Sequence, residues 1–184
     1  MARLVDLLAQ RSVLEIACGT GYWTQFHAEK AKAVTATDFN EAVLSIARAR
    51  LQDRGNVQVR QADAFSLKNP GPAFDAGFAG FWWSHVERQR MDAFLDGLHA
   101  CLLPGSRVVF ADNLYVEGNS TPVSRTDGDG NTYQIRRLAD GRRFEVLKNF
   151  PTRAEFEHVA GRFGGEVHFE ASAYFWCGWY DLPD

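Results

Sequence analysis

The chain has 184 residues, a formal net charge of −3 at pH 7 and three cysteines, and this length suits one domain with its own core. It has no run of 18 apolar residues and no signal-like basic start, and its slight acidity gives no electrostatic footprint for nucleic acid. The cysteines lack C-x-x-C or metal-ligand spacing, so we expect reduced thiols and no metal site. These features predict one cytoplasmic domain that binds neither nucleic acid nor a membrane.

The first expected strand covers residues 12–16 and is followed by a turn that contains Gly19 and Gly21. Glycine adopts positive φ without steric cost, so the backbone of such a turn can contact a nucleotide-like ligand. A dinucleotide fingerprint would need a third glycine at position 24, where the chain has Thr24. Glu15 would repel a pyrophosphate but attract an ammonium or a sulfonium. The turn therefore favours a cationic ligand over NAD.

Alternating helical and extended patterns continue along the chain. We expect helices over 22–30, 40–52 and 87–101 and strands over 33–37, 56–61, 74–80 and 106–112. Beyond them we expect a hairpin of 132–138 and 142–149 around Asp140-Gly141, a helix from the Thr152/Glu155 capping box to about 163, and strands over 166–171 and 173–180. The alternation predicts a parallel sheet with helices on both faces.

Four further segments join the glycine turn in a fixed order. Asp38 closes the second strand, Asp63 follows the third, residues 74–81 form the fourth, and Leu103-Pro104-Gly105 precedes the fifth. In this order the chain resembles the class I S-adenosylmethionine-dependent methyltransferases of the small-molecule type, similar to methyltransferase types 11 and 12. The resemblance implies one α/β domain over 1–184, a doubly wound Rossmann-like sheet of seven mostly parallel strands with the last antiparallel. The connection between the fifth strand and the Thr152 helix leaves the sheet at the same edge as Asp38 and Asp63, so we expect the hairpin, an insertion at about 115–150, to lie near the acceptor pocket and to choose the substrate.

The resemblance implies S-adenosylmethionine as cofactor, S-adenosylhomocysteine as product, and a set of binding residues at the carboxyl ends of the strands. These residues are Glu15, Ala17, Gly19, Gly21, Trp23, Asp38, Phe39, Asp63, Ala64, Phe65, Gly80 and Phe81. Glu15 would hold the methionine ammonium, Asp38 the ribose hydroxyls and Asp63 the adenine amino group. Structural alternatives are a salt-bridged strand-end acid for Glu15, a helix cap for Asp38 and a solvated loop acid for Asp63.

Two residues are candidates for catalysis. His85 lies just past the fourth strand and titrates near neutrality, so it is the candidate general base, and Tyr115 could orient a substrate. A structural histidine and a packing tyrosine are the alternatives. Trp82 and Trp83 should point to opposite sides if their segment is extended. The segment 80–83 is not the Asn/Asp-Pro-Pro-Tyr/Phe motif of base and glutamine N-methylation, which leaves a small-molecule acceptor.

The sequence thus predicts transfer of a methyl group to an O, N or S atom of a small molecule. A non-catalytic cofactor-binding protein and an NAD(P)-dependent oxidoreductase are the alternatives. About a dozen residues precede the first strand and supply one helix at most, so we expect an open pocket or a lid that this sequence does not contain.

The expected hairpin carries Arg136 and Arg137 on one strand and Arg142 and Arg143 beside its turn. Strand alternation should send one arginine of each adjacent pair inward. An inward guanidinium would favour a carboxylate or a phosphate on the acceptor. The alternative is a solvated edge hairpin whose charges discourage aggregation.

Overall fold

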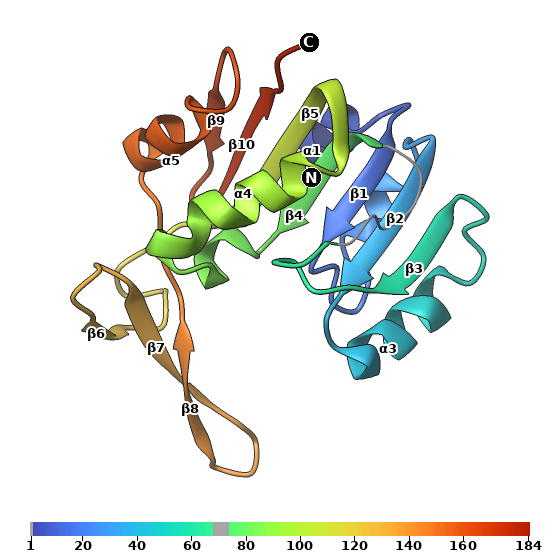
Figure 1. Cartoon of the computed structure of the whole chain (residues 1–184). Coiled ribbons are helices and arrows are strands. Elements are labelled where there is room, and N and C mark those ends of the chain that lie inside the picture. The colour runs from blue at the N-terminus through green and yellow to red at the C-terminus, as the bar shows by residue number, and fades with distance from the viewer. Residues whose placement is uncertain (1, 68–73) are drawn as a thin grey trace.

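A computed structural model describes residues 2–67 and 74–184, and its main feature is a seven-stranded sheet (Figure 1). In spatial order the strands are β3 (Val57–Gln61), β2 (Ala33–Asp38), β1 (Ser12–Ile16), β4 (Phe74–Gly80), β5 (Leu102–Asn113), β10 (Phe175–Asp181) and β9 (His168–Ala171). β10 is antiparallel to both of its neighbours, whereas β1 to β5 run parallel to one another. This confirms the expected doubly wound sheet.

Helices cover both faces of this sheet. On one face lie α1 (Ala2–Leu7), α2 (Thr24–His27) and α3 (Glu41–Leu51), and on the other lie α4 (Met91–His99) and α5 (Arg153–Ala160). Alternate residues of each strand enter separate cores: Val13 packs with the first group of helices, whereas Leu14 packs with the second. None of the described helices is long and apolar enough to cross a membrane.

Local signals explain where two of the helices begin. The Asn40 side chain accepts a hydrogen bond from the Ala42 N–H at 2.9 Å, which caps α3. Thr152 and Glu155 form the expected capping box at the start of α5. Other boundaries differ from the prediction: the helix expected over 87–101 is a 3-10 turn, Arg88–Arg90, followed by α4.

A separate three-stranded sheet stands off the carboxyl-terminal edge of the main sheet (Figure 1). Its strands are β6 (Val123–Thr126), β7 (Thr132–Arg137) and β8 (Arg143–Leu147), all antiparallel. The expected hairpin is β7–β8, and Gly141 in its turn has φ +85°. β6 was not predicted, because its sequence is short and polar and only pairing with β7 makes it a strand.

Candidate functional site

The turn after β1 has three residues in the left-handed region: Ala17 at φ +54°, Gly19 at +55° and Gly21 at +71°. The Gly19 N–H donates to Asp38 Oδ2 at 2.9 Å, which ties this turn to the end of β2. A Cβ on Gly21 would lie 2.8 Å from Leu51 Cδ1, so glycine also lets the turn pack against α3. The turn therefore lies at the carboxyl ends of β1 and β2, with glycine at two of its three left-handed positions.

A pocket of about 360 Å³ opens beside this turn. It is lined by Ala17, Asp38, Phe39, Ala62, Asp63, Ala64 and Trp82. Five of these residues belong to the predicted binding set, and they come from the ends of three strands, β1, β2 and β3. They are Ala17, Asp38, Phe39, Asp63 and Ala64. Trp82 was not in that set, and its indole N–H is buried without a hydrogen-bond partner among the described residues.

The two acids of this pocket are held by backbone N–H groups. Asp38 accepts from the Gly19 N–H and the Asn40 N–H, both at 2.9 Å, and a carboxylate has about four lone-pair sites. The Asp38 carboxylate therefore has about two further acceptor sites, and its predicted role toward ribose hydroxyls stays a prediction. Asp63 Oδ1 accepts from the Phe65 N–H at 2.8 Å and so shapes the turn after β3. Both acids line the pocket. Asp38 also accepts the hydrogen bond from the backbone N–H of Asn40, the N-cap residue of α3.

Glu15 lies beneath the turn in a buried contact. Its side chain is 2% exposed, and Oε2 lies 3.0 Å from Nε2 of His27, which is fully buried. This is the contact expected of a salt-bridged strand-end acid. A carboxylate has two oxygens, and His27 uses one of them. The role of Glu15 toward a methionine ammonium stays a prediction.

The aromatic residues after β4 divide between core and pocket. Phe81 adopts φ +58°, which is uncommon for a non-glycine residue, and its ring stacks on Trp23 with centroids 5.3 Å apart. These two rings line a second cavity, of about 260 Å³, beside Phe175. Gly80 is required because a Cβ there would lie 2.9 Å from Phe78 Cζ. Of the two predicted binding residues at the end of β4, Phe81 lines this second cavity, and neither Gly80 nor Phe81 lines the first pocket.

Trp82 and Trp83 lie in different environments, although both pack with the same core cluster and do not point to opposite sides of an extended segment. Trp82 lines the first pocket, whereas Trp83 is 4% exposed and packs in the core against Phe110, 4.9 Å between centroids. Residues Trp83–His85 form a 3-10 turn, so the segment is not extended and the alternation of an extended segment does not apply.

His85 is fixed by one hydrogen bond. Its Nδ1 lies 2.8 Å from the backbone oxygen of Leu147, the last residue of β8. Partial desolvation lowers the pKa of His85, and the Lys148 ammonium lowers it further. Tyr115 packs edge-on against Phe150, with centroids 5.3 Å apart. These contacts place both catalytic candidates beside the three-stranded sheet and its connections.

A buried ion pair joins this sheet to β5. Lys148 Nζ lies 3.1 Å from Asp112 Oδ1 and donates to Ser84 Oγ at 2.6 Å. Asp112 also accepts from the N–H groups of Ser84 and Asn113. The sequence gives no signal for this pair, because its members are 36 positions apart and lysine is ordinarily exposed.

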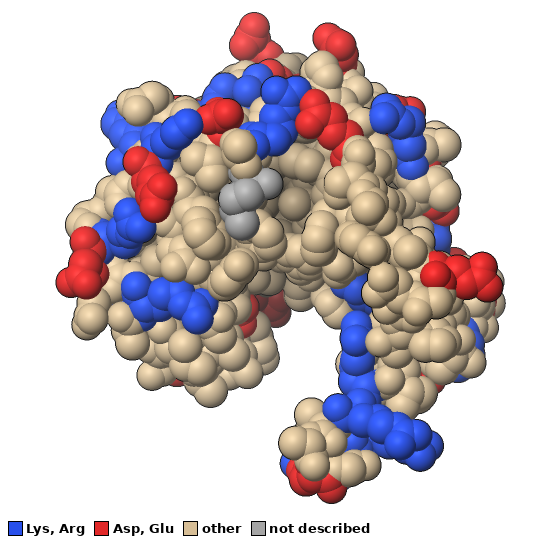
Figure 2. Space-filling model, turned by 180° about the vertical axis from the view of Figure 1, so that it is seen from behind, with Lys and Arg blue, Asp and Glu red and all other residues tan. Residues whose placement is uncertain are grey.

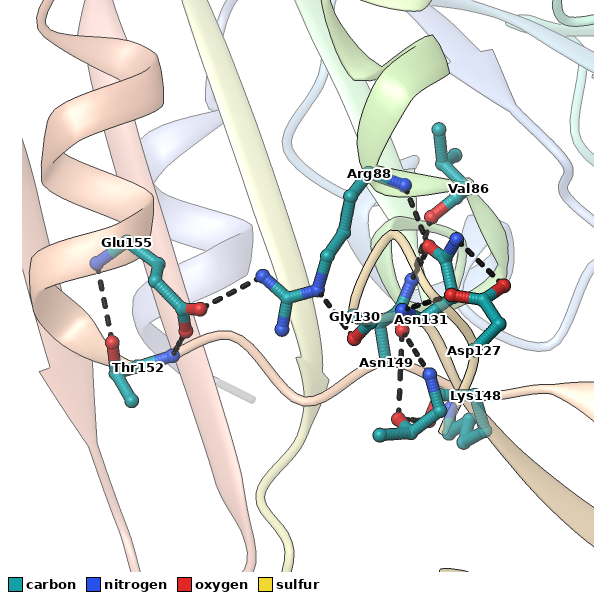
Figure 3. Close-up of polar contacts among 10 residues, drawn as sticks. Val86, Arg88, Asp127, Gly130, Asn131, Lys148, Asn149, Thr152 and Glu155 are labelled. Carbon is teal, nitrogen blue, oxygen red and sulfur yellow. Dashed lines mark hydrogen bonds and ion pairs between the residues drawn. The ribbon is translucent and has the colours of Figure 1, made fainter. Parts of the chain in front are cut away.

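A second network anchors the same sheet (Figure 3). Asn149 Nδ2 donates to the Val86 oxygen at 3.0 Å and to Asn131 Oδ1 at 3.2 Å, and Asn131 Oδ1 also accepts from the Arg88 N–H. Arg88 extends to Glu155 on α5, 2.8 Å away. These bonds hold the ends of β7 and β8 against the edge where the pockets open.

The fold, the glycine turn and the acid at the end of β2 are those of a class I S-adenosylmethionine-dependent methyltransferase. A family model described as a methyltransferase domain matches residues 13–105, half of the chain, and the chain belongs to this family. The match ends before the three-stranded sheet begins.

Individual relatives agree with this family. A demethylmenaquinone methyltransferase of Clavibacter sepedonicus is 34% identical over 110 residues, covering 60% of this chain and 44% of the relative. The ubiquinone/menaquinone biosynthesis C-methyltransferase UbiE of Coxiella burnetii (strain RSA 493 / Nine Mile phase I) is 35% identical over 107 residues, covering 54% and 42%. The chain thus spans less than half the length of these curated relatives.

Two solved structures extend the likeness beyond the family match. The DhpI-SAH complex superposes with a TM-score of 0.77 at 29% identity, covering all of this chain and 82% of that one. The DhpI-SAM-HEP complex gives 0.73 at 29% identity, covering 91% and 77%. The likeness to the DhpI-SAH complex therefore includes the three-stranded sheet, which the family model leaves out.

Proposed function

We propose that this chain transfers the methyl group of S-adenosylmethionine to an O, N or S atom of a small molecule. The observation that carries the proposal is the pocket beside the glycine turn, where the Asp38 and Asp63 carboxylates meet at the carboxyl edge of the sheet. The neighbouring DhpI structures are complexes with SAH and SAM, which supports the same cofactor here. As the sequence indicates, we propose a cytoplasmic enzyme.

The residues present fit the cofactor. Asp38 has lone pairs for the ribose hydroxyls, Asp63 and Ala64 would face the adenine, and Phe39 offers a ring face that is 71% exposed. Glu15, buried beneath the turn beside His27, is the proposed partner of the methionine ammonium. When bound, S-adenosylmethionine supplies an electrophilic methyl group whose bond to sulfur breaks, with the electron pair staying on sulfur, as the bond to the acceptor forms.

The protein's part in this step is positioning and, for a protonated acceptor, removal of a proton. In-line displacement gains most of its acceleration from holding the acceptor atom in line with the methyl group. His85 would take the proton on Nε2, because Nδ1 is committed to the Leu147 oxygen. A carboxylate or phosphate acceptor would need no base.

A second candidate is C-methylation of a quinone, which the names of the curated relatives favour. The family match ends at residue 105, so it does not include the three-stranded sheet or its connections. Demethylmenaquinone added to the enzyme with S-adenosylmethionine decides between the two: methylated quinone would establish C-methylation.

Calorimetric titration with S-adenosylhomocysteine tests the cofactor site. Asp38→Ala should weaken binding about tenfold or more, because a bond to a charged group contributes roughly 1.5–3 kcal/mol. Asp53→Ala, which removes an exposed acid just after α3, is the matched control and should bind as the unaltered chain does. An unchanged Kd for Asp38→Ala would show that Asp38 is not part of the site. Tighter binding of NAD or NADP than of S-adenosylhomocysteine would contradict the proposed cofactor.

Turnover needs a separate measurement. Transfer of labelled methyl to a panel of small metabolites separates an enzyme from a cofactor-binding protein, since the latter would bind S-adenosylhomocysteine and methylate nothing.

A further inference from the structure

A cavity of about 660 Å³ lies between the end of β5 and the three-stranded sheet. Asn113 and Phe175 come from the main sheet, and Gln134, Arg136 and Lys148 come from β7 and the chain after β8. Figure 2 shows the main body and the three-stranded sheet separated by an indentation, with Lys and Arg side chains along the edge of the smaller sheet that borders it. The volume is within the range of small-molecule sites.

The charge of this cavity is one-sided. Arg136 and Lys148 line it, and no carboxylate does so among the described residues. The Lys148 ammonium is paired with the buried Asp112 carboxylate, so Arg136 carries the charge of this lining that no ion pair among the described residues neutralises.

Arg136 is available to a ligand. Its Nη1 donates to Thr121 Oγ1 at 3.1 Å, and it makes no ion pair within the part of the chain that the structure describes. A guanidinium has five N–H donors, so most of them are unused. Gln134 and Arg136 are two positions apart on β7 and share a face, whereas Arg137 faces away, opposite Arg143 in the strand register.

Lys148 is held in place before any ligand arrives. The residue is 4% exposed, and its ammonium is bonded to Asp112 and Ser84. An ammonium has three donors, so these two bonds leave one. A charge fixed by a buried partner needs no further ordering when an anion binds.

Gln134 is an independent indication of a ligand. It is 1% exposed and its Nε2 donates to the Thr121 oxygen at 2.5 Å, but Oε1 has no hydrogen-bond donor among the described residues. A buried carbonyl oxygen without a donor is costly, and an O–H or N–H group of a ligand, or a water, would satisfy it, whereas an anionic oxygen would not.

We propose that this cavity binds the acceptor, and that the acceptor is a small organic anion held by Arg136 and Lys148. The inference rests on the proposed methyltransferase function and adds the substrate class. Phe175 lines both this cavity and the cavity of about 260 Å³ beside Phe81 and Trp23, so these two cavities share a wall. The shared chemistry is a carboxylate or a phosphate-type group, and the experiment separates the two.

The test uses the full chain saturated with S-adenosylhomocysteine and three probes of similar size: inorganic phosphate, acetate and neutral acetamide. Binding is followed by thermal shift and by NMR titration at constant ionic strength. Phosphate or acetate should bind and acetamide should not. Tighter binding of phosphate would indicate a phosphate-type group on the acceptor, and tighter binding of acetate would indicate a carboxylate. Arg136→Gln should raise the Kd for the anion at least tenfold. Arg137 lies next to it on the opposite face of β7, and the Arg137→Gln variant should bind the anion as the unaltered chain does.

Equal binding of acetamide, or equal loss in the two arginine variants, would overturn the anion site, since neither depends on a specific guanidinium. The Kd of the unaltered chain for S-adenosylhomocysteine is measured before the anions are tested. If that ligand binds and the anions fail, the acceptor inference alone is wrong. If S-adenosylhomocysteine itself fails to bind, the proposed function is wrong.

Discussion

Nδ1 of His85 lies 2.8 Å from the backbone oxygen of Leu147, and this contact decides which ring nitrogen can act. A carbonyl oxygen only accepts, so Nδ1 must carry the proton and donate it. Nε2 then holds a lone pair whenever the ring is neutral. The pKa of His85 is lowered by desolvation and by Lys148, which favours the neutral ring at pH 7.

His85→Ala should lower kcat by about 10² to 10⁴-fold with an acceptor that loses a proton, and should leave the S-adenosylhomocysteine Kd nearly unchanged. The unaltered enzyme should lose activity as the pH falls through the lowered pKa of His85. His158→Ala, an exposed histidine on α5, is the control. Equal loss of rate and of cofactor binding would identify His85 as structural.

Glu15→Gln should weaken the binding of S-adenosylhomocysteine by about tenfold or more, because the ammonium loses a charged partner. It should not change the affinity for 5′-methylthioadenosine, which lacks the amino acid part. Calorimetry with both ligands on both proteins gives the comparison. If both ligands are weakened alike, Glu15 acts through its contact with His27 and not on the ammonium.

Lys148→Met should lower the free energy of unfolding by about 3–5 kcal/mol, because it leaves the Asp112 carboxylate buried without its cation. Adding Asp112→Asn should recover part of this loss, since the uncompensated charge is removed while an acceptor oxygen remains. Urea denaturation of the two single variants and the double variant measures both effects. A single-variant loss below about 1 kcal/mol would contradict a buried, uncompensated charge.

His99 should make stability depend on pH. Burial lowers its pKa to about 4, and its Nε2 lies 2.8 Å from Tyr180 Oη. The unfolded chain therefore binds a proton near pH 6.5 that the folded chain binds only near pH 4, so the free energy of unfolding falls as the pH drops between these values.

The ring is partly exposed, so we expect a contribution of about 1–2 kcal/mol after solvent screening. Relative to the unaltered chain, His99→Gln should gain this amount between pH 7 and pH 4.5 in denaturant titrations, and His158→Gln should gain nothing. A pH-independent difference would show that His99 titrates normally.

The sequence by itself determined the order and type of most elements, because their signals are local. The glycine turn after β1, the Asn40 cap of α3, the capping box at Thr152 and the Asp140-Gly141 turn each depend on residues a few positions apart. The edge where Asp38 and Asp63 meet also followed, since parallel strands end on the same side of a sheet.

Tertiary structure alone decided which side chains meet across the chain. Glu15 contacts His27, Lys148 contacts Asp112, and β6 exists only by pairing with β7. In the sequence Lys148 was one cation among several in a mixed-charge segment, and nothing local marked it as buried. Burial and pairing of charges depend on packing between distant segments, because the cost of desolvation and its compensation arise only when the fold brings the partners together.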